Sequence, residues 1–142
     1  MVHLSREKLV IPSELAEICR TQQTIVNKVS EAGFNENAAF AVRLALDEAL
    51  SNAVRHGNCG DPNKQVVVEY CIDDTGVMIT ITDEGCGFNP KQVPDPTRDE
   101  NLHRPNGRGI MLMKAYMSEV RYNDRGNRLT LVKRRDCPLP KM

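Results

Sequence analysis

An alanine-dense stretch at residues 36–56 constrains the fold of this 142-residue chain more than any other feature. Alanine has the highest intrinsic helix propensity, Asn35 can cap the start of such a helix, and Gly57 can end it. A helix of this length needs a second layer that covers its apolar side. The apolar positions on its neighbouring faces are Val42, Leu46, Ala49, Leu50 and Ala53.

A second helix precedes this stretch. Residues 5–11 predict a short first strand that ends at Pro12, and Ser13 is expected to cap a helix that runs through about Glu31. Gly33 is expected to stop that helix. Its apolar positions are Leu15, Ile18, Ile25, Val26 and Val29.

The strand signals come in two pairs. Residues 65–72 and 77–83 are rich in β-branched side chains and are joined by the turn sequence DDTG, which predicts a hairpin. Residues 119–123 and 127–134 predict a closing hairpin, preceded by a short helix at 109–117. Helices segregated from such pairs indicate an α+β fold, a two-layer α/β sandwich with a mixed, mostly antiparallel sheet and helices on one face.

Length and composition narrow the class of protein further. The length predicts one domain over residues 1–142. Basic and acidic residues balance at 19 each, which argues against a nucleic-acid partner. No apolar run approaches the roughly 20 residues of a membrane span, and the N-terminus lacks a secretory signal pattern. We therefore expect a soluble, cytoplasmic protein with no membrane partner.

The five cysteines are odd in number and form no C-x-x-C pair, so they predict neither a zinc ribbon nor a thioredoxin-like site. His56 and Cys59 lie three residues apart and could share a metal, but structural zinc needs four ligands. Reduced thiols that behave as small hydrophobes are the favoured interpretation.

The first of three motifs lies on the alanine-dense helix. Glu48, Asn52 and His56 are four residues apart and therefore share one helical face, which borders the apolar one. An acid and an amide oxygen one turn apart could serve Mg²⁺, which takes few protein oxygens and binds substrate phosphates. A solvated polar stripe is the alternative interpretation.

The second motif is the sequence DEGCGF at residues 83–88, directly after a predicted strand. Gly85 and Gly87 allow the backbone to approach a ligand closely, or simply to turn. Asp83 could accept a hydrogen bond from an exocyclic amine such as that of adenine. An acidic turn without a ligand remains open as an alternative.

The third motif is the sequence NGRGIMLM, in which Gly107 and Gly109 open a helix. The free N–H groups of a helix N-terminus favour phosphate, and Arg104 and Arg108 could add charge-assisted contacts. The third glycine of a dinucleotide-binding fingerprint is missing, and the chain contains no P-loop sequence. Residues 88–106, with four prolines and few apolar side chains, predict a functional lid between the second and third motifs.

In this order the motifs resemble the GHKL (histidine-kinase-like) ATPase superfamily, whose ATP-binding domain has the Bergerat fold. The resemblance implies that Glu48 acts as a base, that Asn52 coordinates Mg²⁺ and that Asp83 binds the adenine of ATP. It also implies that residues 88–106 form the ATP lid. The glycines that it implies near the nucleotide are Gly85, Gly87, Gly107 and Gly109.

Within the superfamily, the runs EALSNAVRHGN and NGRGIMLM are similar to stand-alone anti-sigma-factor serine kinases of the partner-switching type. That similarity implies an ATP-dependent serine/threonine kinase that phosphorylates an anti-sigma-factor antagonist, sequesters a sigma factor and forms a homodimer. Three alternatives remain. They are a nucleotide-gated binding module without phosphotransfer, the ATP-binding domain of a split two-component kinase, and a structural α+β domain with coincidental motifs.

Overall fold

The computed structural model describes residues 5–85 and 105–135, with side chains described for residues 6–85 and 111–135. The described strands form one sheet in the spatial order β1-β2-β3-β5-β4, and every neighbouring pair is antiparallel. The strands are β1 (Ser5–Pro12), β2 (Gln65–Ile72), β3 (Gly76–Thr82), β4 (Glu119–Tyr122) and β5 (Arg128–Arg134).

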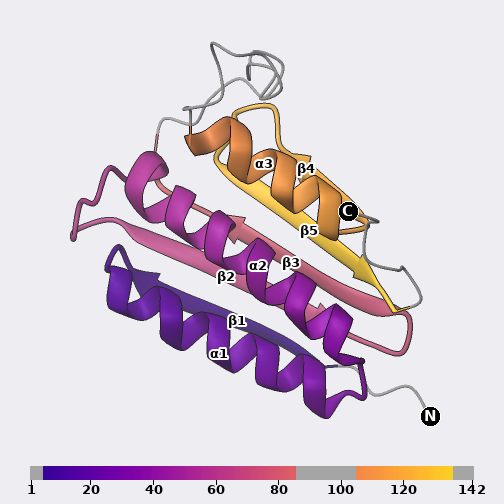
Figure 1. The fold of residues 1–142 in the computed structure, drawn as a ribbon. Coiled ribbons are helices and arrows are strands. Elements are labelled where there is room, and N and C mark those ends of the chain that lie inside the picture. The colour runs from indigo at the N-terminus through magenta and orange to yellow at the C-terminus, as the bar shows by residue number, and fades with distance from the viewer. Residues whose placement is uncertain (1–4, 86–104, 136–142) are drawn as a thin grey trace.

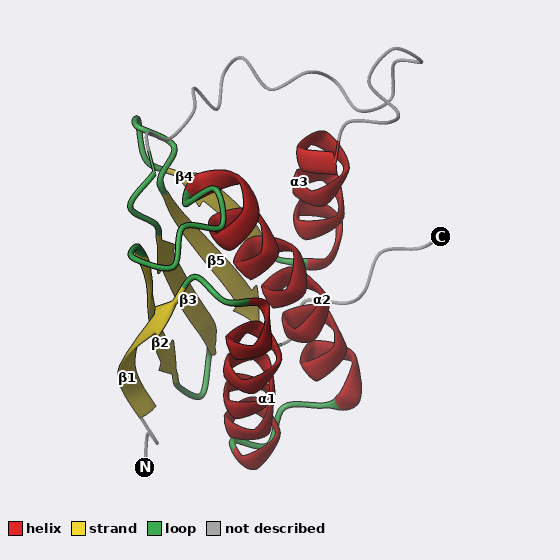
Figure 2. Cartoon of the chain, turned by 90° about the vertical axis from the view of Figure 1, so that its left-hand side faces the viewer, coloured by secondary structure: helices red, strands yellow, loops and turns green. Residues whose placement is uncertain are grey.

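The described helices all cover the same face of this sheet, as Figures 1 and 2 show. They are α1 (Leu15–Glu31), α2 (Glu36–Asn52) and α3 (Pro105–Tyr116), and a π-helical turn, η1 (Ala53–Gly57), continues α2. The predicted α+β two-layer sandwich is thus confirmed, and its sheet is antiparallel throughout the described strands instead of mixed. No helix in the described ranges is both long and apolar enough to cross a membrane.

The start of α1 differs from the prediction. The residue before the helix is Glu14, not Ser13, and its side chain makes no capping hydrogen bond. Ser13 is buried instead, and its hydroxyl donates to the carbonyl of Lys64 at 2.8 Å. Leu15, expected to face the core, is 52% exposed, whereas Thr21 is buried among the apolar side chains of α1. The hydroxyl of Ser13 therefore joins the end of β1 to the residue before β2 and does not cap α1.

The junction between α1 and α2 follows the prediction. Gly33 has a φ of 86° and ends α1 in the left-handed conformation that glycine adopts without strain. Asn35 caps α2, because its side-chain oxygen accepts the N–H of Ala38 at 2.8 Å. All five apolar positions predicted for the long helix are buried, at Val42, Leu46, Ala49, Leu50 and Ala53.

The C-terminal end of α2 is more unusual than the sequence suggests. The α-helix ends at Asn52, and the chain widens into the π turn η1 before it leaves the helix. The helical segment ends at Gly57, as predicted, and the residues with a left-handed φ follow it, at Cys59 (54°) and Gly60 (67°). Single π turns of this kind are frequent at functional sites.

The core lies between the helices and the inner face of the sheet. Along β2 and β3 every second residue is buried, which is the pattern of strands covered on one face. The turn between them is held by Asp73, whose carboxylate accepts the N–H groups of Thr75 and Gly76 at 2.8 and 3.1 Å. The two predicted hairpins are therefore confirmed, with β5 inserted between β3 and β4.

Helix α3 begins at Pro105, four residues before the predicted start, and proline suits the first position of a helix. At its other end, the buried Lys133 of β5 donates from Nζ to the carbonyl of Tyr116 at 2.9 Å. A cation at a helix C-terminus satisfies a free carbonyl and favours the helix dipole. This contact ties α3 to the sheet.

Candidate functional site

The end of η1 meets the turn that follows β3. A β-carbon built on Gly57 would overlap the carboxylate of Asp83, so the α-carbon of Gly57 lies directly against that side chain. Only glycine leaves the room for this approach. Asn52 is the last residue of α2, directly before η1, and the structure therefore brings the first and second sequence motifs to the same end of the sandwich.

Asp83 is held firmly in place. Its backbone N–H donates to the carbonyl of Asn127 at 2.9 Å, and the Asn127 side-chain amide donates to its carbonyl at 3.2 Å. One carboxylate oxygen accepts the N–H of Gly85 at 2.9 Å. Burial raises the pKa of Asp83, while the Gly85 N–H and the charges of Arg125 and Lys64 act in the opposite direction. The site thus keeps a partly desolvated carboxylate in one orientation.

Gly85 makes the second close approach. A β-carbon on Gly85 would overlap the carbonyl oxygen of Gly57, which is a backbone atom that cannot rotate away. The sequence predicted this glycine for access to a ligand or for a turn, and the structure gives it a packing reason as well. The guanidinium of Arg125 donates to the Gly85 carbonyl at 3.4 Å, from the loop before β5.

Tyr122 lies near the same carboxylate. Burial first, and the charge of Asp83 second, raise its pKa to about 12, so the phenol stays protonated throughout the physiological range. The sequence did not single out Tyr122, Arg125 or Asn127, because all three belong to the distant closing hairpin. Only the pairing of β3 with β5 brings this hairpin beside the second motif.

Glu48 and Asn52 are half-buried on α2, between its apolar face and the solvent. Within the described part of the chain, neither side chain has a hydrogen-bond or ion-pair partner, so their oxygens are available to a ligand. Burial, and then repulsion from Asp47, raise the pKa of the Glu48 carboxyl. A desolvated carboxylate with a raised pKa is the usual state of a general base.

Asn58 is a buried residue beside the candidate site that its sequence context does not single out. Asn58 follows η1 directly, is 0% exposed, and its side chain hydrogen-bonds to Ser13, Gln65 and Glu84. An asparagine in a run of turn residues resembles many others in sequence, so its burial could be recognised only from the fold.

The remaining predicted residues are described less fully. The backbone of Gly107, Arg108 and Gly109 lies in the first five residues of α3, so both glycines are inside the helix and not before it. Gly87 and Arg104 lie outside the described residues, as does the predicted lid up to residue 104. The roles predicted for these five residues stay predictions.

His56 and Cys59 are both exposed, and the thiol of Cys59 donates to the carbonyl of His56 at 3.7 Å. Across residues 5–85 and 105–135, no group of three or more His, Cys, Asp or Glu side chains is placed to hold a metal ion. The magnesium site predicted at Glu48 and Asn52 would not form such a group, because it has only one acidic side chain and one amide.

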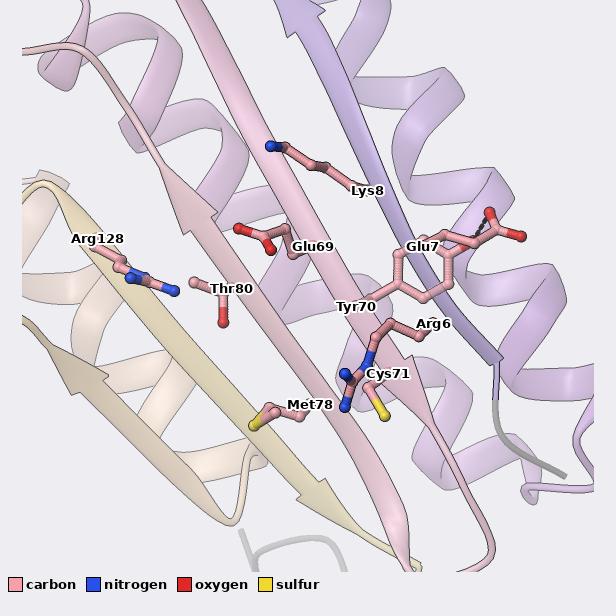
Figure 3. A pocket seen from close by; sticks show the side chains of 9 residues that line it. All are labelled: Arg6, Glu7, Lys8, Glu69, Tyr70, Cys71, Met78, Thr80 and Arg128. Carbon is pink, nitrogen blue, oxygen red and sulfur yellow. Dashed lines mark hydrogen bonds between the residues drawn. The ribbon is translucent and has the colours of Figure 1, made fainter. Parts of the chain in front are cut away.

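A shallow hollow lies on the outer face of the sheet, away from the helices (Figure 3). Cys71 of β2 and Met78 and Thr80 of β3 are among the residues that line it. None of the candidate residues lines it, so we do not assign the nucleotide motifs to this hollow. The lining residues are Arg6, Glu7, Lys8, Glu69, Tyr70, Cys71, Met78, Thr80 and Arg128.

Fold and site together define a class of protein: an antiparallel α/β sandwich with a candidate ligand site where the end of a long helix meets the turn after the third strand. The chain matches the family model described as the histidine kinase-like ATPase domain over residues 11–133. It therefore belongs to the histidine kinase-like ATPase family, as the resemblance predicted. Membership of an ATPase family implies that the chain uses a nucleotide.

Several curated relatives carry more specific names. The chain is 26% identical over 132 residues to the serine-protein kinase RsbW of Listeria monocytogenes, an alignment that covers 88% of this chain and 84% of the relative. It is 35% identical over 94 residues to an anti-sigma F factor of Geobacillus, which covers 64% of each chain.

A solved structure shares the fold. The crystal structure of the RsbU and RsbW domains of Rv1364c from Mycobacterium tuberculosis matches with a TM-score of 0.67 and 18% identity. The match covers 97% of this chain and 34% of that one. It supports the α+β architecture described above.

Proposed function

We propose that this chain is an ATP-dependent serine/threonine protein kinase that acts as an anti-sigma factor and phosphorylates an anti-sigma-factor antagonist. The observation that carries the proposal is the Asp83 turn packed against the end of η1, which follows directly on the helix that carries Glu48 and Asn52. Within the described residues, neither of these two side chains has a hydrogen-bond or ion-pair partner. Relatives named serine-protein kinase and anti-sigma F factor support the choice of reaction and partners.

Asp83 is the proposed adenine reader, because its carboxylate is fixed and can accept a hydrogen bond from an exocyclic amine. Gly85 lies beside it at the same turn. The proposed phosphate side of the site draws on residues whose contacts are not described. They are Gly87, Arg104, Gly107, Arg108 and Gly109.

The oxygens of Asn52 and Glu48 fit Mg²⁺, which prefers hard oxygen ligands and takes few of them from the protein. Asn52 is the proposed protein ligand. A bound Mg²⁺ would neutralise charge on the phosphates of ATP. The other contributions come from the chain itself, which orients the nucleotide through Asp83 and keeps Glu48 ready as a base.

Glu48 is the proposed base that accepts the proton of the serine hydroxyl. The serine oxygen forms a bond to the γ-phosphorus of ATP, and the bond from that phosphorus to the β-γ bridging oxygen breaks to release ADP. The added phosphate brings about −1.5 to −2 charges to the antagonist, which explains how repulsion at the contact surface could release it. The freed kinase would then hold its sigma factor. We further propose that the protein works in the cytoplasm and that a homodimer is the working unit.

The testing experiment compares Glu48→Gln and Asn52→Ala with the wild type. Mg·ADP should raise the melting temperature of the wild type and of Glu48→Gln, and Asn52→Ala should lose most of this shift. Phosphate transfer from labelled ATP to a serine-bearing antagonist should be lost in Glu48→Gln, by a factor of about 10² to 10⁴ for removal of a general base.

The absence of any thermal shift at millimolar Mg·ADP would remove the nucleotide site from this proposal. Retained nucleotide binding without transfer in the wild type would favour the alternative, a nucleotide-gated protein-binding regulator. A pulldown from native cytosol with and without ATP separates the subgroups. Recovery of a sigma factor supports partner switching, whereas recovery of two-component proteins would indicate a split histidine kinase.

A further inference from the structure

The side chain of Asn58 joins three segments that meet beside the candidate site. Its amide nitrogen donates to the hydroxyl of Ser13 at 2.8 Å and to the carbonyl of Gln65 at 3.0 Å. Its oxygen accepts the N–H of Glu84 at 2.7 Å. Both amide protons and the carbonyl are used, and the residue is 0% exposed, so only one orientation of this amide satisfies its surroundings.

The bond to Gln65 has a clear physical reason. Hydrogen bonds alternate along an antiparallel pair, and here the N–H of Ser13 donates to the carbonyl of Lys64. The carbonyl and N–H of the next residue, Gln65, therefore point away from β1 and toward the turn after β3, beyond the last β2–β3 pair, Val67–Thr82. Asn58 supplies a donor for the Gln65 carbonyl, and the Glu84 carboxylate accepts the Gln65 N–H at 2.5 Å. The first residue of β2 is thereby tied to the turn after β3.

The bond to Glu84 bears directly on Asp83. The N–H of Glu84 belongs to the same peptide group as the carbonyl of Asp83, so Asn58 holds the main chain of Asp83 from one side. Asn127 holds it from the other side through two hydrogen bonds. With Gly57 packed against the carboxylate, the direction of that carboxylate is determined by its immediate neighbours.

The direction of a carboxylate decides which nucleobase it can recognise. Adenine offers an exocyclic amine that donates to a carboxylate, whereas guanine has a carbonyl oxygen at the same ring position. Two acceptors facing each other repel, so a fixed carboxylate discriminates between the bases. A carboxylate that is free to turn can accept instead from the N1–H and N2–H₂ groups of guanine, which lie next to that oxygen.

We propose that Asn58 is a positioning residue that sets the preference of this site for adenine over guanine nucleotides by fixing the Asp83–Glu84 peptide. The inference rests on the proposed function, since it takes Asp83 as the residue that reads the base. It predicts that loss of Asn58 changes selectivity, and does not only lower stability.

The experiment measures the dissociation constants of Mg·ADP and Mg·GDP by titration calorimetry for the wild type, Asn58→Ala and Asn35→Ala. Asn35→Ala is a matched control, because it also deletes a hydrogen-bonding asparagine side chain, at the start of α2. We expect the ADP-over-GDP preference to fall at least tenfold in Asn58→Ala and to stay unchanged in Asn35→Ala.

Asn58→Asp is a second variant, for use where Asn58→Ala folds poorly. It retains an acceptor for the Glu84 N–H and loses the donors to Ser13 and Gln65, so it should melt at a lower temperature yet keep most of the preference for ADP.

An unchanged preference in Asn58→Ala, or an equal loss in Asn35→Ala, overturns the positioning role while leaving the proposed function intact. A wild-type protein that binds neither nucleotide overturns both.

Discussion

Gly57 and Asp83 are packed so closely that no β-carbon fits between them: on Gly57 it would lie 2.8 Å from Asp83 Oδ1 and closer still to Oδ2. The contact joins the end of η1 to the residue that follows β3, and the two residues are 26 positions apart in sequence. It sets the position of the carboxylate that we propose to recognise the nucleobase.

The first prediction concerns this contact. In Gly57→Ala the carboxylate of Asp83 must turn away and gives up its bond to the Gly85 N–H, so nucleotide affinity should fall at least tenfold. The loss of stability should stay at about 1 kcal/mol, because a side chain can move aside at the low end of overpacking costs. Titration calorimetry with Mg·ADP and urea unfolding measure the two effects.

Gly85→Ala should be the more damaging substitution. Its β-carbon would meet the backbone carbonyl of Gly57, which cannot rotate away, and we expect a loss of about 3 kcal/mol in the free energy of unfolding. Gly60→Ala is the control, because Gly60 has a left-handed φ of 67° but open space around it. It should cost about 1–2 kcal/mol through backbone strain alone and leave nucleotide affinity unchanged. A loss of nucleotide affinity in Gly60→Ala as large as that expected for Gly57→Ala would contradict the steric explanation.

A second prediction follows from the burial of Asp83. Because its pKa is raised above the usual 3.8, the folded protein binds this proton more tightly than the unfolded chain does. The carboxylate therefore lowers stability as pH rises from 3.8 through the raised value. Asp83→Asn should remove that loss, so the variant should melt no lower than the wild type at pH 7 without nucleotide.

The same substitution should weaken nucleotide binding. The amide of asparagine is neutral, so it is a weaker acceptor for the exocyclic amine of adenine than a carboxylate is. Hydrogen bonds to charged groups contribute about 1.5–3 kcal/mol. We expect Mg·ADP to bind roughly 10- to 100-fold more weakly to Asp83→Asn, measured by calorimetry. A variant that both melts lower at pH 7 and keeps full affinity would show that Asp83 is a structural residue.

Local rules predicted most of the elements and failed where a distant partner competed. Asn35 caps α2 as expected, and within the described residues its side chain has no other hydrogen-bond partner. Ser13 has the same capping ability, yet its hydroxyl bonds to Lys64 and accepts from Asn58. Both of these partners lie more than 40 residues further along the chain, so no local pattern could reveal them.

The candidate site shows the same division. Glu48, Asn52 and Asp83 could be predicted because each lies in a short motif with recognisable chemistry. Asn58 and Asn127 could not, since their contacts depend on where β2 and β3 meet beyond the end of η1 and on how β3 pairs with β5. These supporting residues act through main-chain groups, which leave little trace in sequence.

A third prediction distinguishes the role of the Asn35 side chain from that of the Ser13 side chain. Asn35→Ala should cost about 1 kcal/mol, as expected for the loss of an N-cap, without changing nucleotide affinity. Ser13→Ala should also lower stability, because Asn58 then lacks an acceptor for one amide proton in a buried position. It should in addition weaken Mg·ADP binding through the Asp83 turn. Equal effects of both variants on affinity would contradict this coupling.

The last prediction tests Glu48 as the base through its neighbour Asp47. A base must be ionised, so the rate of phosphotransfer at saturating Mg·ATP should fall tenfold per pH unit below the pKa of Glu48. Burial and the like charge of Asp47 both raise that pKa. Asp47→Asn removes one of the two causes, and the acidic limb of the rate profile should therefore move to lower pH. Glu36→Gln, which removes an exposed acid from the first turn of the same helix, is the control and should leave the limb in place. An acidic limb that does not respond to Asp47→Asn, or that moves equally in Glu36→Gln, would mean that another group is titrating.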